Sequence, residues 1–350
     1  MQSAASPRQP EIIDSEETLD ESLTRPRCEL VSFIESVRGP LLILGAGGKM
    51  GPTLAALARR AAEAAGQKLE VVAVSRFSDA NARRWLEVRG VKTVNCDLLQ
   101  ADQVRHLPDA ENVIYLVGLK FGTSQSPATT WAINTLVPAR VCERYPRSRI
   151  VALSTGNVYP LSQVKGGGSV ESDALAPLGE YSNATVGRER IFEFHSSQNG
   201  TRVVLLRLFY AAELRYGVLR DIADKIWAGQ PVELGNGYFN CIWQGDANEM
   251  ILRALPLAVS PPAAFNLTSI DIFSVRTVAE RLGQLLGRPV TFAGEGSDNA
   301  LLGNTSRLCS RLGAPPTPLD TMLRWTAHWV KIGGRNLGKP THFDVRDGKY

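Results

Sequence analysis

Three glycines spaced three residues apart follow a short apolar run in the first third of the chain. Residues 41–44 are all Leu or Ile, and Gly45, Gly48 and Gly51 come next in the order G-x-x-G-x-x-G. The first glycine of such a loop permits a tight turn after a strand, the second lets the backbone approach a pyrophosphate, and the third lets a helix pack closely on the sheet. The N–H groups that open the helix then face the anion. An alanine-rich helical pattern does follow, and this context favours a dinucleotide site over a plain glycine-rich turn.

Short apolar runs alternate with helical patterns through the first two thirds of the chain. The expected strands cover residues 41–44, 70–74, 91–94, 113–117, 150–153 and 202–208. The expected helices cover residues 51–65, 80–88, 128–145 and 181–197. This alternation predicts an α/β fold, a Rossmann-like doubly wound parallel sheet covered by helices on both faces.

The pattern changes near residue 208 and predicts four parts. Residues 1–38 form an N-terminal arm, whose first 25 or so residues are polar, acidic and interrupted by prolines and are expected to be loose. Residues 39–208 form the dinucleotide-binding domain. Residues 209–330 form a smaller α/β lobe that covers the carboxyl ends of the strands, where ligands of open sheets bind. Residues 331–350 are rich in glycine and charge and form an extended C-terminal tail.

Composition argues against several classes of partner. The 350 residues carry a formal net charge of +4 without a long basic run, which disfavours nucleic acid. The five cysteines contain no C-x-x-C pair and the four histidines complete no metal-ligand spacing, so we expect no metal. No apolar run approaches the length of a membrane span, and the first residues lack the apolar core of a signal peptide. We therefore expect a cytoplasmic protein with reduced thiols and no membrane partner.

The end of the second predicted strand bears on the choice of cofactor. Enzymes that prefer NAD usually place Asp or Glu there, against the ribose 2′-hydroxyl. This strand ends at Ser75 and Arg76, neither of which is an acid. Arg76 could pair with a 2′-phosphate, and Lys49 adds a second cation in the glycine loop. The alternative is a solvated surface arginine. The pattern favours NADP slightly over NAD.

Several further motifs follow the glycine loop in a characteristic order. They are Cys96-Asp97-Leu98, Gly118-Leu119-Lys120, Asn134, Ser154-Thr155-Gly156-Asn157-Val158-Tyr159, Glu171, Tyr181, Leu206-Arg207-Leu208-Phe209, Asp246, Phe265-Asn266-Leu267 and Ser274-Val275-Arg276. With these motifs, residues 40–330 resemble the extended short-chain dehydrogenase/reductase family, in its NAD-dependent epimerase/dehydratase group. The resemblance implies further cofactor contacts at Met50, Asp97, Leu98, Val117 and Gly118, with Asp97 on the adenine side.

The resemblance also implies a catalytic set of residues. In the family a tyrosine transfers the proton of a carbinol, and a serine or threonine holds the substrate oxygen. The matching residues are Tyr181 and Thr155, with Ser154 beside Thr155 and Asn134 on the preceding helix. A lysine four residues after the tyrosine lowers its pKa, because a phenol with a pKa of about 10 is a poor base at neutral pH. Here that position is Thr185.

A different cation must therefore act on Tyr181 if the family's chemistry is retained. Arg188 lies nearly two helical turns from Tyr181 on a similar face, and Lys120 belongs to a Gly-Leu-Lys run resembling that of UDP-galactose 4-epimerases. The alternative is that Tyr181 only packs or forms hydrogen bonds. The protein would then be a dinucleotide-binding sensor or interaction protein with a degenerate site.

Two further departures from the family concern the substrate. Sugar-nucleotide dehydratases carry Asp-Glu directly after the catalytic threonine, whereas this chain has Gly156 and Asn157. Nucleotide-sugar enzymes usually carry an arginine about six residues before the aspartate matched by Asp246, and none is present here. A diphosphate would lose charge-assisted binding without it. We therefore expect an NAD(P)-dependent oxidoreductase or epimerase of a carbohydrate-type small molecule that is not carried on a nucleotide diphosphate. The family's helix pair at 128–145 and 181–197 suggests a homodimer, although its apolar stripes fit a core equally well.

Overall fold

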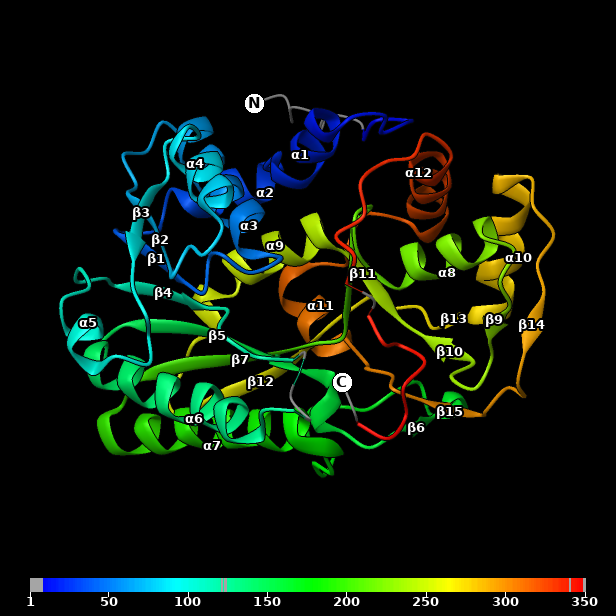
Figure 1. Ribbon diagram of the computed structural model, residues 1–350. Helices are drawn as coiled ribbons and strands as arrows, with labels where there is room; N and C mark the ends of the chain where they lie inside the picture. Colours follow the sequence, from blue (N-terminus) through cyan, green and yellow to red (C-terminus); the bar gives the residue numbers. More distant parts are fainter. Residues whose placement is uncertain (1–8, 121, 123–124, 340, 349–350) are drawn as a thin grey trace.

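A seven-stranded parallel sheet forms the centre of the computed structural model, which describes residues 9–120, 122, 125–339 and 341–348 (Figure 1). Its strand order is β12-β7-β5-β4-β1-β2-β3. The strands are β1 (Leu41–Leu44), β2 (Val71–Ser75), β3 (Lys92–Asn95), β4 (Asn112–Tyr115), β5 (Arg149–Thr155), β7 (Arg202–Leu208) and β12 (Ala263–Leu267). The order reverses direction between β1 and β4, which is where ligands bind in doubly wound sheets. The predicted Rossmann-like sheet is confirmed.

Helices cover both faces of this sheet because its strands are apolar on both sides. Alternate residues of β1 enter opposite cores: Leu41 and Ile43 belong to one, Leu42 and Leu44 to the other. The large-domain helices are α3 (Gly51–Ala64), α4 (Ala80–Glu87), α5 (Ala101–Arg105), α6 (Pro127–Arg144), α7 (Gly179–Asn199) and α9 (Gln244–Arg253). In Figure 1, α6 and α7 run along one face and α3 and α9 lie on the other. A homodimer through α6 and α7 stays a prediction.

A smaller lobe packs around a separate apolar core beside the carboxyl ends of the strands. Its helices are α8 (Val218–Trp227), α10 (Val275–Leu286) and α12 (Leu319–Lys331). Short strand pairs join it to the loops: β8 (Tyr210–Ala212) with β11 (Cys241–Trp243), β9 (Val232–Glu233) with β14 (Phe292–Ala293), β10 (Tyr238–Phe239) with β13 (Phe273–Ser274), and β6 (Ser162–Gln163) with β15 (Asn299–Ala300). Helix α11 (Ser306–Leu312) packs on β12. Three 3-10 turns complete the fold: η1 (Gly156–Val158), η2 (Val164–Gly166) and η3 (Leu255–Leu257).

The N-terminal region is more ordered than its polar composition suggested. Residues 16–34 form α1 (Glu16–Thr24) and α2 (Cys28–Ile34), which pack against α3 and α9. Leu19 and Leu23 are buried, as are Leu30 and Ile34. These pairs lie four residues apart, so each helix has an apolar stripe. The stripe of α1 joins the core of the smaller lobe, and the stripe of α2 joins a core of the large domain. The expectation of a loose arm is therefore wrong for this part, while residues 1–8 lie outside the described residues.

The last residues of the chain leave α12 and fold back over the junction of the two lobes. We call residues 341–348 the C-terminal segment; in Figure 1 it is the red trace that ends near the start of α7. None of its residues belongs to a helix or a strand. None of the helices among the described residues is long and apolar enough to span a bilayer.

Candidate functional site

The glycine loop between β1 and α3 has the backbone shape that a pyrophosphate needs. Gly45 has a φ of +83°, which only glycine adopts easily. A Cβ on Gly51 would lie 2.5 Å from the Cα and the carbonyl oxygen of Ala46, so the helix could not pack as it does with any other residue. Gly48 has only the Gly45 carbonyl within reach of a Cβ, at 3.3 Å, and its other side is open. The residues present thus fit a dinucleotide whose phosphates lie at the start of α3.

Sequence reasoning missed a fourth glycine with a structural role. A Cβ on Gly47 would lie 2.6 Å from the Oγ of Ser75 at the end of β2. The loop therefore packs directly against the strand that carries Arg76. Arg76 itself is exposed, and its carbonyl accepts a hydrogen bond of 2.9 Å from the Asn95 side chain.

The adenine-side residues named from the sequence form the next loop along the sheet edge. The Asp97 carboxylate accepts a hydrogen bond of 3.0 Å from the Leu99 N–H, and the Asp97 N–H donates to Gln103 at 2.7 Å. Leu98 is buried in the core beneath the loop. These contacts hold the loop in one shape, while Met50 and Val117 lie partly buried against the two cores.

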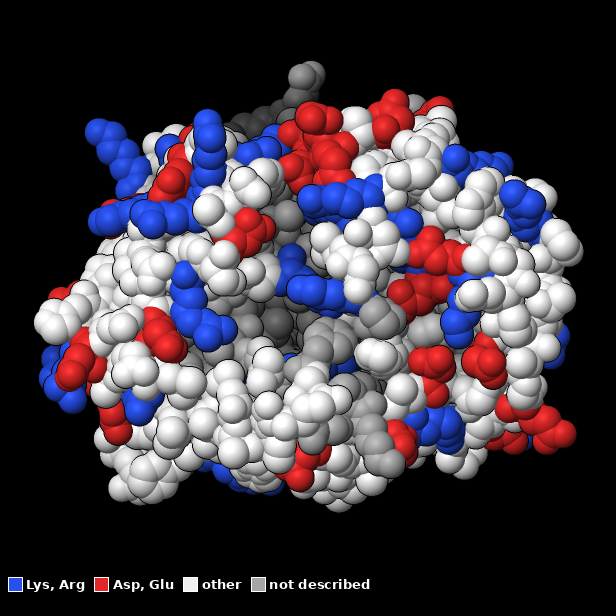
Figure 2. Space-filling view, viewed as in Figure 1, with Lys and Arg blue, Asp and Glu red and all other residues white. Residues whose placement is uncertain are grey.

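Two lysines lie near each other at the glycine loop. Lys49 belongs to the loop itself, and Lys120 belongs to the loop after β4. The Lys49 ammonium lies 3.0 Å from the centroid of the Tyr216 ring, and the Lys120 ammonium donates to the Thr341 carbonyl at 3.4 Å. Burial lowers the pKa of Lys49 to about 7, helped by the neighbouring cation Lys120. Burial also lowers the pKa of Lys120, to about 8. Figure 2 shows a hollow in the middle of this face with Lys and Arg side chains at its rim.

Thr155 ends β5, and Tyr181 lies near the start of α7. Thr155 is the last residue of β5, and its Oγ1 accepts a hydrogen bond of 3.2 Å from the Asn157 N–H. Its own hydroxyl proton can therefore still be donated. Tyr181 is the third residue of α7, which packs against the turn η1 that follows Thr155. Both side chains are nearly buried, with 9% of Tyr181 and 8% of Thr155 exposed.

Ser154, by contrast, points into a buried ionic network. Its hydroxyl donates to the Glu189 carboxylate, which also forms a two-bond ion pair with Arg207 at 2.7 and 3.0 Å. Arg207 donates in turn to the Tyr159 hydroxyl at 2.6 Å, and that hydroxyl donates to Asn266 at 3.0 Å. Several motifs that carried the sequence resemblance thus join β5, α7, β7 and β12 below the site.

Thr185, which occupies the position of the family's lysine, is turned into the protein. The Thr185 hydroxyl donates to the Tyr181 carbonyl one turn earlier at 2.9 Å, and Thr185 is fully buried. The cation on this helix is instead Arg188, of which 3% is exposed. Arg188 donates to the Leu153 carbonyl at 2.7 Å and to the Asn134 side-chain oxygen. The structure thereby brings together two of the residues that the sequence singled out.

Arg188 lies directly behind the loop that follows β4. A Cβ on Gly118 would lie 2.6 Å from an Arg188 nitrogen, although Gly118 itself is exposed. Both hydrogen-bond acceptors of the guanidinium are neutral, and its Nε has no hydrogen-bond partner among the described residues. Arg188 is therefore a buried cation that faces the exposed loop without a charged partner in these contacts. A buried charge of this kind is costly unless an anion comes near it.

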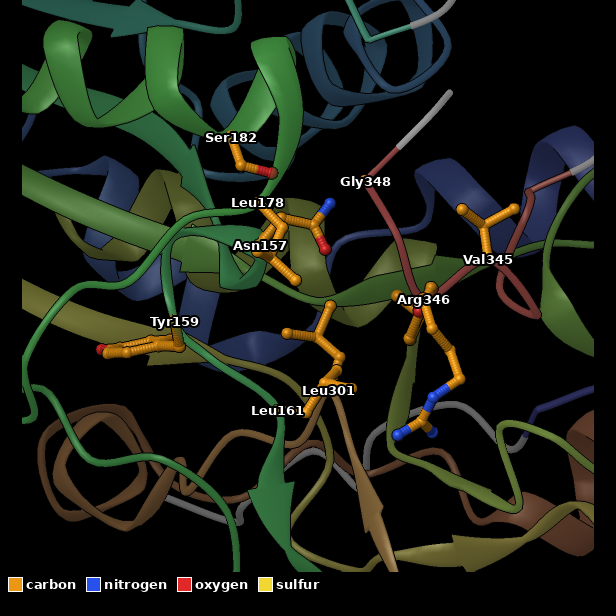
Figure 3. A pocket seen from close by; sticks show the side chains of 10 residues that line it. Asn157, Tyr159, Leu161, Leu178, Ser182, Leu301, Val345, Arg346 and Gly348 are labelled. Atoms are coloured by element: carbon orange, nitrogen blue, oxygen red, sulfur yellow. The ribbon is translucent and has the colours of Figure 1, made fainter. Parts of the chain in front are cut away.

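A small cavity is lined by Ser182, the residue after Tyr181, and by Asn157, two residues after Thr155 (Figure 3). Its volume is about 30 Å³, and its walls include Asn157, Ser182 and Tyr210 on one side and residues of the C-terminal segment on the other. In Figure 3 the Asn157 and Ser182 side chains lie close to each other across from Gly348. Among the described residues, no group of three or more His, Cys, Asp or Glu could hold a metal ion.

Sequence reasoning did not include Tyr216, Asp221 or the C-terminal segment in the site. Burial raises the pKa of the Tyr216 phenol, and the nearby Asp221 and Tyr181 contribute to the same shift. Tyr216 thus lies between the glycine loop and the start of α7. These residues come after residues 202–208, the last strand predicted for the large domain. No spacing in the sequence predicts that they lie near the site.

Comparisons with known proteins concern the family and the fold of the chain. The model of the "NAD dependent epimerase/dehydratase family" matches residues 41–255. No curated protein sequence matches the chain.

Solved structures with the same fold include three sugar-nucleotide epimerases. UDP-glucuronic acid 4-epimerase from Bacillus cereus, in complex with NAD, is 17% identical with a TM-score of 0.70, over 84% of this chain and 96% of that one. UDP-glucose 4-epimerase from Thermotoga maritima, with UDP-glucose, is 16% identical with a TM-score of 0.67, over 84% and 99%. UDP-glucose 4-epimerase from Thermus thermophilus, with NAD, is 17% identical with a TM-score of 0.67, over 83% and 98%.

Proposed function

The chain belongs to the NAD-dependent epimerase/dehydratase family, and from this premise we propose that it is an oxidoreductase or epimerase of a carbohydrate-type substrate that is not carried on a nucleotide diphosphate. The observation that supports the proposal is that α7, which carries Tyr181, packs against the turn that follows Thr155 at the end of β5, in a fold whose glycine loop fits a dinucleotide. The bound nicotinamide would accept and return a hydride.

The chain's own residues would manage the proton of the substrate's carbinol. Thr155 can donate a hydrogen bond to the carbinol oxygen, because the bond that it accepts from the Asn157 N–H leaves its hydroxyl proton available. Tyr181 then takes the proton as the carbonyl forms and gives it back when the hydride returns. The near burial of both side chains excludes water from the transfer.

Arg188 is the cation that we propose in place of the missing lysine. Side chains on a helix lean toward its N-terminus, which here is the end that carries Tyr181. The guanidinium is held by Asn134 and the Leu153 carbonyl and has no negative partner among these contacts. Its field favours a negative charge above Gly118, and a Tyr181 phenolate would supply that charge. Lys120 is the second contributor, and it loses its own charge near pH 8.

The region that would bind the substrate departs from the arginine pattern given above for nucleotide-sugar enzymes. Six residues before Asp246 stands Asn240, whose amide donates to the Gly303 carbonyl at 2.7 Å and which is fully buried. It offers no cation to a diphosphate. We therefore propose a smaller sugar, sugar acid or polyol as the substrate.

Cofactor choice is a separate part of the proposal. The family is NAD-dependent, and two of the three solved structures named above hold NAD. The exposed Arg76 at the end of β2 replaces the acid that would select against a 2′-phosphate. We propose that NADP binds at least as well as NAD, through Arg76.

The proposal is tested by replacing Tyr181 with phenylalanine and measuring cofactor binding and turnover separately. Tyr181→Phe should keep its affinity for NAD and lose turnover of free sugars, sugar acids or polyols, whereas Tyr238→Phe, on β10 of the smaller lobe, should keep both. Retained binding without turnover in the wild-type chain would instead support the second candidate, a dinucleotide-binding sensor, which the change from lysine to Thr185 favours.

A further inference from the structure

The C-terminal segment is attached to both lobes at one point near the glycine loop. The Thr341 N–H and hydroxyl both donate to the Asp221 carboxylate on α8, at 2.8 and 2.5 Å. The Thr341 carbonyl accepts from Lys120, which belongs to the loop after β4. Thr341 is 2% exposed. Through Thr341 the segment therefore forms hydrogen bonds both with a cation of the cofactor domain and with an acid of the smaller lobe.

Two further anchors fix the middle of the segment to the smaller lobe. Phe343 is buried in that lobe's core, 6.4 Å from the Phe239 ring, and its carbonyl accepts a hydrogen bond from Asn236. Arg346 donates to the Gly235 and Asn299 carbonyls, both at 3.0 Å. In Figure 3 the Arg346 side chain extends away from Asn157, toward the smaller lobe that it anchors.

The end of the segment lies against the start of α7. A Cβ on Gly348 would collide with the backbone of Leu178, and a Cβ on Gly179 would collide with the Gly348 carbonyl. Only two glycines facing each other permit this contact. Tyr181 follows two residues later, so the segment ends beside the proposed acid–base residue.

The cavity next to Ser182, the residue after Tyr181, is far too small for a sugar. It is partly closed by Val345, Arg346 and Gly348 and has a volume of about 30 Å³, whereas sites for small molecules usually measure about 300–1,000 Å³. We propose that the C-terminal segment occupies the substrate site as an internal competitor and that the substrate binds by displacing it.

The contacts of the segment indicate what kind of substrate would replace it, if the proposed function holds. Displacement takes the Thr341 contacts away from the Lys120 ammonium, which can bind a carboxylate, and from the Asp221 carboxylate, which can accept hydrogen bonds from two hydroxyl groups. The Asn236 amide is freed for another oxygen. An ammonium, a carboxylate and an amide in this arrangement suit a polyhydroxylated acid, such as a free sugar acid.

Two full-length variants loosen the segment, and each has a matched control. Gly348→Ala introduces the collision with Leu178, while Gly338→Ala has the same left-handed backbone and nothing within 4 Å. Arg346→Ala removes the anchor on Gly235 and Asn299, while Arg335→Ala removes only an ion pair of a mostly exposed side chain. Thermal melting of all four variants establishes that they fold, and NAD affinity should be unchanged in each.

The measurement is the dissociation constant of D-glucuronate for the NAD-saturated protein, by calorimetry. If the segment is docked in about nine of ten molecules, releasing it tightens the apparent constant about tenfold. We expect that effect in Gly348→Ala and Arg346→Ala, and less than twofold in the two controls. Equal constants in Gly348→Ala and Gly338→Ala, including no binding in either, would overturn the proposal. A different result would contradict the proposed function. That result is full turnover in Tyr181→Phe, whether or not the segment is loosened.

Discussion

Arg188→Gln should raise the pH at which the enzyme becomes active, because the guanidinium stabilises the Tyr181 phenolate. The two residues are seven apart on α7, which corresponds to about 10 Å along the helix axis. At that distance, with an effective dielectric constant of about 20, one charge contributes about 1.7 kcal/mol. This corresponds to about 1.2 units on the pH axis of the activity profile. Side chains on a helix lean toward its N-terminus, where Tyr181 lies, so we expect a displacement of at least one pH unit.

The assay is the pH dependence of kcat/KM, whose acidic limb, where activity rises with pH, reports the free enzyme's proton acceptor. Arg188→Lys should restore part of the shift, since it keeps the charge but not both hydrogen bonds. Arg190→Gln is the matched control on the same helix, because Arg190 is exposed and pairs with Glu193 at 2.6 Å. The reasoning is refuted if Arg188→Gln and Arg190→Gln have the same apparent pKa while both remain folded.

Three further predictions concern the cofactor and stability. Gly48→Val should fold normally but lose most of its NAD affinity in calorimetry, because the new side chain fills the open side of the loop; Gly166→Val, which also has open space, should keep it. Arg76→Ala should weaken NADP by roughly 1.5–3 kcal/mol and leave NAD unchanged, and equal losses for both cofactors would contradict the role of Arg76. Burial raises the pKa of Asp246 to about 6, so the folded state holds a proton that the unfolded state has lost between pH 4 and 6. The stability that this proton gives is present below pH 4 and is lost as the pH rises through 6, by up to about 3 kcal/mol. Urea unfolding of Asp246→Asn should lack this fall relative to the wild type, and a parallel pH dependence of the two would contradict it.

The sheet and the glycine loop could be predicted because local sequence determines them. The strands of the Rossmann domain are short apolar runs between turn residues, and their alternation with helices leaves few possible topologies. The roles of Gly45 and Gly51 follow from a positive φ and a close helix contact that no other residue permits. The helices at residues 16–34 escaped prediction because their apolar stripes are short and are set within a polar, acidic sequence.

The site was only partly predictable, because its charges depend on contacts between distant segments. The sequence places Arg188 on the helix of Tyr181 but cannot show that Asn134 and the Leu153 carbonyl hold it behind Gly118. The C-terminal segment has no periodic pattern, and its contact with Asp221 joins residues 120 apart in the chain. Its position is fixed by the tertiary fold alone.

Reduction of protein-bound NAD by a substrate is the most direct test of the proposed chemistry. The NAD-loaded protein is mixed with a panel of free sugars, sugar acids and polyols, and the absorbance of the reduced nicotinamide is followed in the wild type and in Tyr181→Phe. We predict reduction by at least one member of the panel in the wild type and none in Tyr181→Phe, with equal NAD affinity in both. Equal reduction in the two proteins, or none in a wild type that binds NAD, would contradict the account.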